Sequence, residues 1–189
     1  MMVNLKINDL PVSVEAGSTI LEAASKLDIR IPTLCHFKMD CFQVEHRSGS
    51  CRVCVVEVKG RPNLAPACST PVTEGMEVQT NSLRAINARR TILDLLLSDH
   101  PKDCLICPKN LNCSLQALAQ EMGLHQLLYK GEQSTYNKDL SSKAIARDLD
   151  KCSMCRRCEG AGNVVQSVGV LSGVGRGFNA VVGTAGLKP

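Results

Sequence analysis

The stretch that decides the fold reads Gly49-Ser50-Cys51-Arg52-Val53-Cys54-Val55-Val56-Glu57-Val58, a pair of cysteines followed at once by a valine-rich run. The run predicts a β-strand over residues 53–58, because β-branched residues favour extended backbone and Gly60 follows. A second strand is predicted over residues 76–79, directly after Gly75. The cysteine pair is therefore expected inside a small domain that contains a β-sheet.

The residues before this stretch predict a hairpin and a helix. Residues 3–7 and 12–14 alternate apolar and polar side chains, and Asn8-Asp9 marks the turn between them. Thr19 and Glu22 form a capping-box pattern ahead of a helix that ends near Asp28. Strand, strand, helix, strand, strand over about eighty residues predicts an α+β domain with a mixed sheet and one crossing helix.

The second half of the chain has a different pattern. Apolar residues at helical spacing predict a helix over residues 82–97. Ser114 is expected to cap a second helix that runs to Met122, where Gly123 ends it. Residues 130–148 are polar and predict a connector, and the Gly- and Val-rich residues 168–186 predict a hairpin with glycine turns rather than a phosphate-binding loop.

The composition makes cysteine the most informative residue type. The 189 residues include 11 cysteines and no Trp, and aromatic residues make up 3%. Without a leader pattern or a run long enough to span a membrane, we expect a soluble, cytoplasmic protein whose thiols stay reduced. The odd cysteine count also disfavours a fully paired disulfide framework, and scattered basic residues give no reason to expect nucleic-acid binding.

A first set of four cysteines has the spacing C-x15-C-x2-C-x13-C. Four thiolates can hold zinc or a 2Fe-2S cluster. Zinc ribbons usually present two C-x2-C knuckles, so one pair flanked by single cysteines favours the cluster. The predicted ligands are Cys35, Cys51, Cys54 and Cys68, with Cys41 interpreted as an unligated bystander or a substitute ligand.

A second set has the spacing H-x3-C-x2-C-x5-C between the two predicted helices. It consists of His100, Cys104, Cys107 and Cys113. One imidazole and three thiolates usually bind zinc, and they can also serve an iron-sulfur cluster. The spacing alone leaves both open.

A third set has the spacing C-x2-C-x2-C, formed by Cys152, Cys155 and Cys158. This is the beginning of the bacterial ferredoxin run, whose next cysteine would stand at position 162. Gly162 occupies that position, so this set has three cysteines and lacks the fourth.

The first two motifs, in this order, resemble the N-terminal iron-sulfur region of three related proteins. These are the large electron-input subunit of complex I, the NAD-linked iron-only hydrogenases and the formate dehydrogenase alpha subunit. The resemblance rests on Ile31-Pro32-Thr33-Leu34-Cys35, on the stretch from Gly49 to Val58, on Ala65-Pro66-Ala67-Cys68 and on Ser98-Asp99-His100-Pro101-Lys102-Asp103-Cys104. It implies a β-grasp 2Fe-2S domain over residues 1–79 and a helical 4Fe-4S domain with His/Cys3 ligation over residues 80–128.

By the same resemblance, residues 129–149 are a connector and residues 150–189 an incomplete ferredoxin-like segment. Four explanations stay open for the third cysteine set. They are a 3Fe-4S cluster, a 4Fe-4S cluster completed by a partner chain or solvent, a truncated sequence, or a degenerate site that is empty or binds zinc.

The expected function is single-electron transfer, because no nucleophile-base pair or nucleotide fingerprint predicts a catalytic residue. The resemblance implies a flavin- and NAD(P)H-binding partner subunit, with ferredoxin or a catalytic subunit as a further partner. Two alternatives are an N-terminal fragment of a catalytic hydrogenase or formate dehydrogenase subunit, and a zinc-stabilised interaction module. His36, His46 and His125 are interpreted as ordinary surface residues.

Overall fold

The computed structural model describes residues 1–39, 41, 44–46, 49–132 and 134–184. Residues 185–189, included above in the last predicted segment and in part in the glycine-rich hairpin, lie outside this description. The chain forms two compact units. The first contains residues 1–34 and 51–92, and the second contains residues 35–50 and 93–189.

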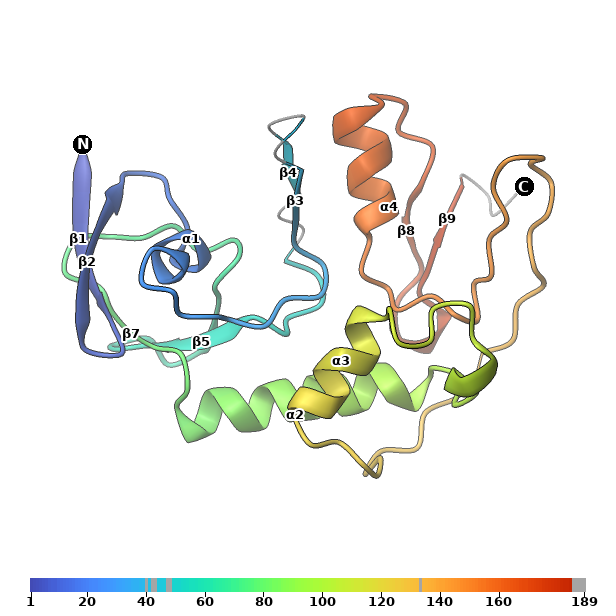
Figure 1. Ribbon diagram of the computed structural model, residues 1–189, viewed down its shortest axis with the longest axis horizontal. Coiled ribbons are helices and arrows are strands. Elements are labelled where there is room, and N and C mark those ends of the chain that lie inside the picture. The colour runs from blue at the N-terminus through green and yellow to red at the C-terminus, as the bar shows by residue number, and fades with distance from the viewer. Residues whose placement is uncertain (40, 42–43, 47–48, 133, 185–189) are drawn as a thin grey trace. The chain divides into compact units, whose positions relative to one another are not determined.

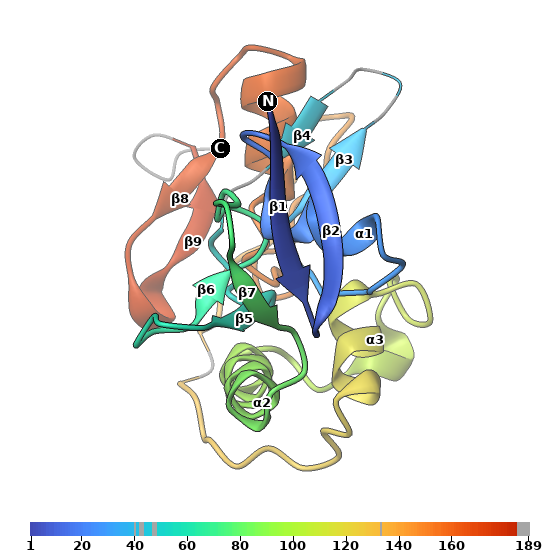
Figure 2. The same ribbon diagram turned by 90° about the vertical axis from the view of Figure 1, so that its left-hand side faces the viewer.

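The first unit is built on a five-stranded mixed sheet (Figure 2). Its strand order is β2-β1-β7-β5-β6, with β1 parallel to β7 and the other neighbours antiparallel. The strands are β1 (Met2–Ile7), β2 (Leu10–Glu15), β5 (Val55–Val58), β6 (Ala65–Pro66) and β7 (Glu77–Gln79). The α+β class with a mixed sheet is confirmed.

The N-terminal hairpin and the first helix form as the sequence predicts. Asn8 and Asp9 have φ of 49° and 67°, the left-handed backbone that a tight two-residue hairpin turn requires. Helix α1 (Ile20–Ser25) begins with the predicted capping box, in which Thr19 and Glu22 satisfy each other's backbone N–H groups. Its buried face packs with sheet residues such as Ile7, Val56 and Val78 in one hydrophobic core.

Helix α2 (Leu83–Ser98) matches the predicted helix and continues from the first unit into the second. The second unit also contains α3 (Ser114–Glu121), α4 (Arg157–Gly160), a π-helical turn (Ala161–Val165) and 3-10 turns at Cys104–Ile106 and Gly177–Asn179. Two hairpins complete it, β3 (Phe37–Met39) with β4 (Val44–His46), and β8 (Ser172–Val174) with β9 (Val181–Gly183) (Figure 1).

The predicted glycine hairpin is confirmed as β8 and β9, with Gly175 and Gly177 in left-handed backbone between the strands. The prediction for the start of α3 was wrong, because Cys113 is the N-cap residue and Ser114 is the first helical residue. The four segment boundaries given above stay predictions. No helix among the described residues is both long and apolar enough to cross a membrane.

Candidate metal centres

Three cysteines of the first set lie in the first unit. Cys51 and Cys54 form the turn that enters β5, and Cys68 follows β6. Antiparallel pairing of β5 with β6 and the Ala67 N–H bond to Cys54 O (3.1 Å) hold this turn beside the Cys68 segment. Cys35 directly follows Leu34 and is the first residue of the second unit.

All four side chains of this set are buried, with exposed fractions of 7% or less. Cys54 and Cys68 also belong to the hydrophobic core. A buried thiolate costs much free energy unless something compensates its charge, and an iron-sulfur centre supplies that compensation. The Val53 N–H lies 3.5 Å from Cys51 Sγ, the kind of hydrogen bond to sulfur that supports a thiolate ligand. The donor set fits a 2Fe-2S cluster.

The second set begins where α2 ends. His100 follows that helix, with its backbone N–H bonded to Leu97 O at 3.2 Å. Its Nδ1 atom is buried and has no hydrogen-bond partner among the described residues. Burial lowers the pKa of His100, and Lys151 lowers it further. A neutral imidazole with an unpartnered buried nitrogen fits a metal ligand.

The three cysteines of this set are more exposed than those of the first. Cys104 begins the 3-10 turn and accepts the Cys107 N–H at 3.2 Å, so the two thiols come from one turn. Cys113 stands at the N-terminus of α3, where its side chain makes no capping hydrogen bond. The sulfur side chains are therefore available as ligands rather than used as helix caps.

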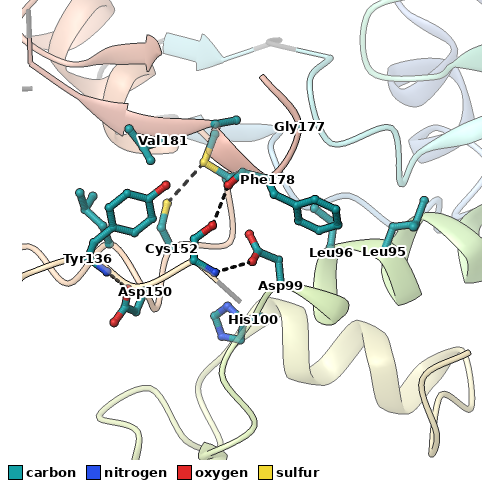
Figure 3. Close-up of a pocket in the computed structure, with 14 residues that line it drawn as sticks. Leu95, Leu96, Asp99, His100, Tyr136, Asp150, Cys152, Gly177, Phe178 and Val181 are labelled. Carbon is teal, nitrogen blue, oxygen red and sulfur yellow. Dashed lines mark hydrogen bonds between the residues drawn. The ribbon is translucent and has the colours of Figure 1, made fainter. Parts of the chain in front are cut away.

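Two aspartates near the end of α2 accept hydrogen bonds from the backbone that follows α3. Asp94 is 1% exposed, and its Oδ2 accepts the Leu128 N–H at 3.0 Å. Asp99 Oδ1 accepts the Ser134 N–H at 3.1 Å (Figure 3). These backbone N–H groups lie outside any sheet or helix, so side-chain carboxylates accept their hydrogen bonds instead.

In the third set, Cys152 and Cys155 lie on the loop that leads into α4, and Cys158 lies in that helix. Burial raises the pKa of Cys152 and of Cys158, and the charge of Cys155 raises both further. Met154 and Arg156 have φ of 52° and 57°, which gives the loop its turns between successive cysteines. A Cβ added at Gly162 would meet nothing within 4 Å, so the missing fourth cysteine leaves open space.

His100 and Cys152 line one pocket of about 240 Å³, together with Asp99, Asp150 and Phe178 among others (Figure 3). The structure therefore brings the second and third sets near each other. Within the part of the chain that the structure describes, no three His, Cys, Asp or Glu side chains already lie grouped as they would around a single metal ion. All eleven cysteines are described, and none forms a disulfide.

The interpretation of His36 and His46 as surface residues was wrong. His36 Nε2 contacts Glu45 Oε1 at 2.6 Å, and both side chains are only 16% exposed. His46 has a buried Nε2 atom, and burial lowers its pKa. The cause is a long-range contact, since the His46 ring packs directly against Gly160. Sequence reasoning also missed Asp103 and Lys151, although each directly precedes a motif cysteine.

Comparison with known families assigns two regions of the chain. Residues 1–83 match the 2Fe-2S iron-sulfur cluster binding domain, and residues 89–127 match the NADH-ubiquinone oxidoreductase-G iron-sulfur binding region. These two matches correspond to the N-terminal 2Fe-2S and 4Fe-4S region that the complex I G subunit shares with NAD-linked hydrogenase subunits. It is an iron-sulfur electron-transfer region.

Individual relatives agree with this assignment. The NADP-reducing hydrogenase subunit HndD of Solidesulfovibrio fructosivorans is 58% identical over 97% of this chain, which covers 32% of that relative. The mitochondrial NADH-ubiquinone oxidoreductase 78 kDa subunit of Candida albicans is 32% identical over 96% of this chain, which covers 25% of it. The chain thus spans a third or less of the length of these curated relatives.

A solved structure gives the same assignment. A chain of the NAD+-reducing [NiFe]-hydrogenase, crystallised in the H2-reduced state, matches with a TM-score of 0.84 and 28% identity. The match covers 96% of this chain and 74% of that one. The family assignment covers the two iron-sulfur regions, whereas the individual ligands stay predictions.

Proposed function

We propose that this chain relays single electrons between a flavin- and NAD(P)H-binding partner subunit and another redox centre of a multi-subunit oxidoreductase. The observation that carries this proposal is the succession of two iron-sulfur regions, residues 1–83 and 89–127, in one chain. A cluster gains one electron as its donor is oxidised and loses it as the next centre is reduced. The chain itself then makes or breaks no substrate bond.

The first relay centre is a 2Fe-2S cluster in a β-grasp domain, held by Cys35, Cys51, Cys54 and Cys68. Burial of all four thiols supports this ligand set. Plant-type clusters with four thiolates have potentials of about −400 mV, which suits exchange with a nicotinamide-linked flavin.

The second centre is a 4Fe-4S cluster held by His100, Cys104, Cys107 and Cys113. The buried, unpartnered Nδ1 of His100 supports the imidazole as a ligand. A neutral imidazole in place of a thiolate removes one negative charge, so this cluster should have a higher potential than its all-cysteine counterpart.

A third cluster, 4Fe-4S or 3Fe-4S, is proposed on Cys152, Cys155 and Cys158. Their C-x2-C-x2-C spacing within seven residues supports a common site. Gly162 supplies no ligand, so a fourth ligand would have to come from elsewhere. Ferredoxin or a catalytic subunit is the proposed partner at the other end of the relay, and the cytoplasm is the proposed location.

The test is iron and acid-labile sulfide analysis with EPR spectroscopy of anaerobically purified protein. Two clusters predict about six irons per chain, and a filled third site predicts about nine or ten. Reduction should give separate 2Fe-2S and 4Fe-4S signals. A colourless, folded preparation that contains zinc alone would instead establish the zinc-stabilised interaction module.

A second candidate is the N-terminal part of a catalytic subunit of a hydrogenase or formate dehydrogenase. The 58% identity to a hydrogenase subunit, of which this chain covers 32%, favours it. Reading the gene beyond residue 189 tests it. A continuing frame with a second C-x2-C-x2-C run supports this candidate, and a stop codon at that point contradicts it.

A further inference from the structure

One ion pair joins the loops of the second and third cysteine sets. Lys151 Nζ lies 2.6 Å from Asp103 Oδ2, and their side chains are 22% and 40% exposed. Lys151 directly precedes Cys152, and Asp103 directly precedes Cys104. This ion pair therefore connects two residues that lie 48 positions apart, each next to the first cysteine of its motif.

The Lys151 ammonium also acts on the predicted ligands of the second set. After burial, Lys151 is the largest cause that lowers the pKa of His100, while Asp103 and Asp99 raise it. The hydrogen bond with Asp103 raises the pKa of Lys151, and the charges of Asp103, Cys107 and Asp148 raise it further. The geometry agrees, because Cys152, the residue directly after Lys151, lines the same pocket as His100.

This placement has a consequence for a redox centre. Reduction adds one negative charge to a cluster, so a cation fixed nearby favours the reduced state and an anion disfavours it. Near neutral pH the Lys151 side chain is an ammonium and the Asp103 side chain a carboxylate, so each carries a full charge.

We propose that Lys151 is a positioning residue for the His100, Cys104, Cys107 and Cys113 centre, that its ammonium raises the reduction potential of that centre, and that Asp103 opposes it. The inference rests on the proposed function, because it requires a cluster at this site. It adds a charged pair outside the ligand set as the group that tunes this step of the relay.

The alternative is an ion pair that only fastens the two loops. The two roles predict different changes in the reduction potential. Lys151→Met and Asp103→Asn both break the same bond, so a fastening role moves the potential in the same direction in both variants. A charge effect lowers the potential in Lys151→Met and raises it in Asp103→Asn.

The experiment is an EPR-monitored redox titration of anaerobically purified full-length chain. At a fixed potential we expect the reduced-to-oxidised ratio of the His-ligated cluster to fall about tenfold in Lys151→Met, which corresponds to about 59 mV for one electron. Asp103→Asn should shift the ratio the other way, and Lys151→Arg should leave it near its original value. The 2Fe-2S signal serves as an internal reference.

Matched controls come from the Lys59–Glu77 pair, whose N–O distance of 2.7 Å is nearly the same. No cysteine or histidine is among the causes that shift the pKa of either residue. Lys59→Met and Glu77→Gln remove the same charges and should leave the His-ligated cluster unchanged. A shift in these controls equal to that in the test variants would overturn the proposal.

Equal potentials in all variants, or shifts of the same sign in Lys151→Met and Asp103→Asn, would also overturn it. If Lys151→Met does not assemble the cluster, two other measurements decide whether the proposal holds. They are the direction of the potential shift in Asp103→Asn and the reduction potential of Lys151→Arg. A native chain without iron is a separate result, because it contradicts the proposed function before any potential is measured.

Discussion

Arg89 is a buried cation on α2, with 2% of its surface exposed. Its Nε and Nη2 atoms donate to Val55 O at 3.1 and 2.8 Å, and Nη2 also donates to Thr80 O at 2.7 Å. Val55 directly follows Cys54. The side chain therefore fixes the backbone next to the first cysteine set.

Replacement of Arg89 by Met should lower the free energy of unfolding by about 3 kcal/mol, because two buried carbonyl groups lose their donor at about 1–3 kcal/mol each. Urea denaturation measures this loss. The neighbouring Arg90 is exposed, so Arg90→Met should change stability by less than about 0.5 kcal/mol. Equal losses in the two variants would contradict the role given to Arg89.

At the residue scale, sequence spacing was enough to nominate the cysteines and His100 as ligands. It was not enough to find the pairing of Lys151 with Asp103, because no local pattern relates side chains 48 positions apart. The same limit explains the error at His46, whose burial depends on a contact with Gly160 far along the chain.

Helix α4 meets the β3–β4 hairpin at Gly160. A Cβ added there would lie 2.3 Å from His46 Nδ1, whereas one added at Gly162 would meet nothing within 4 Å. Gly160→Ala should therefore destabilise the second unit by about 1–3 kcal/mol through overpacking. Gly162→Ala should be neutral or stabilising by up to about 1 kcal/mol, since alanine favours helix.

Thermal unfolding followed together with the His46 ring resonances in NMR spectra would check this pair. The His46 signals should move in Gly160→Ala and stay in place in Gly162→Ala. Identical melting curves and spectra for the two variants would show that the contact is unimportant.

The connector contains a small pH-sensitive element. Asp139 and Arg147 exchange two backbone hydrogen bonds of 2.9 Å, and their side chains form an ion pair. Hydrogen bonds from Ser141, and then from Arg147, lower the pKa of Asp139 to about 2. Folding lowers the pKa of Asp139. The stabilisation from the ionised carboxylate is therefore complete above the pKa of the unfolded chain, about 4, and disappears as the pH falls towards 2.

Amide hydrogen exchange tests this expectation. Protection at Asp139 and Arg147 should decrease between about pH 4 and about pH 2, after correction for intrinsic exchange rates. In Asp139→Asn the protection should be weak at every pH and show no transition in that range. If Asp139→Asn shows the same loss of protection over this pH range, another titrating group causes it.

Elements that are long, or that begin or end with a recognisable turn or capping motif, could be predicted from the sequence. The first hairpin had a two-residue turn, α1 had its capping box and α2 had apolar residues at helical spacing. Strands β3 and β4 have three residues each and α4 has four, so they are held by their neighbours rather than by local preference.

For the whole molecule, we expect the two clusters to be filled independently. The two predicted ligand sets share no residue, since Cys54 belongs to the first set and Cys107 to the second. Cys54→Ala should lose about two irons and the 2Fe-2S signal, and Cys107→Ala about four irons and the 4Fe-4S signal. Iron analysis and EPR of each variant check this. Loss of both signals from either single substitution would contradict independence.

The class of the fold and the order of its iron-sulfur regions followed from the sequence, because motif order is preserved along the chain. The division into units did not follow. The segment from Cys35 to Ser50 interrupts the first cysteine set in sequence, yet it belongs to the second unit with residues 93–189. Only contacts between distant segments determine that membership.

This interleaving restricts how the molecule can be divided. The chain passes between the units three times, after Leu34, after Ser50 and after Ile92. A gene cut after residue 92 would produce the sheet domain together with the β3–β4 hairpin but without the rest of the second unit. His46 would then lose its contact with Gly160 and be exposed to water. One cut in the gene therefore cannot separate the two units, because the second unit takes residues from both sides of the first unit's later segment.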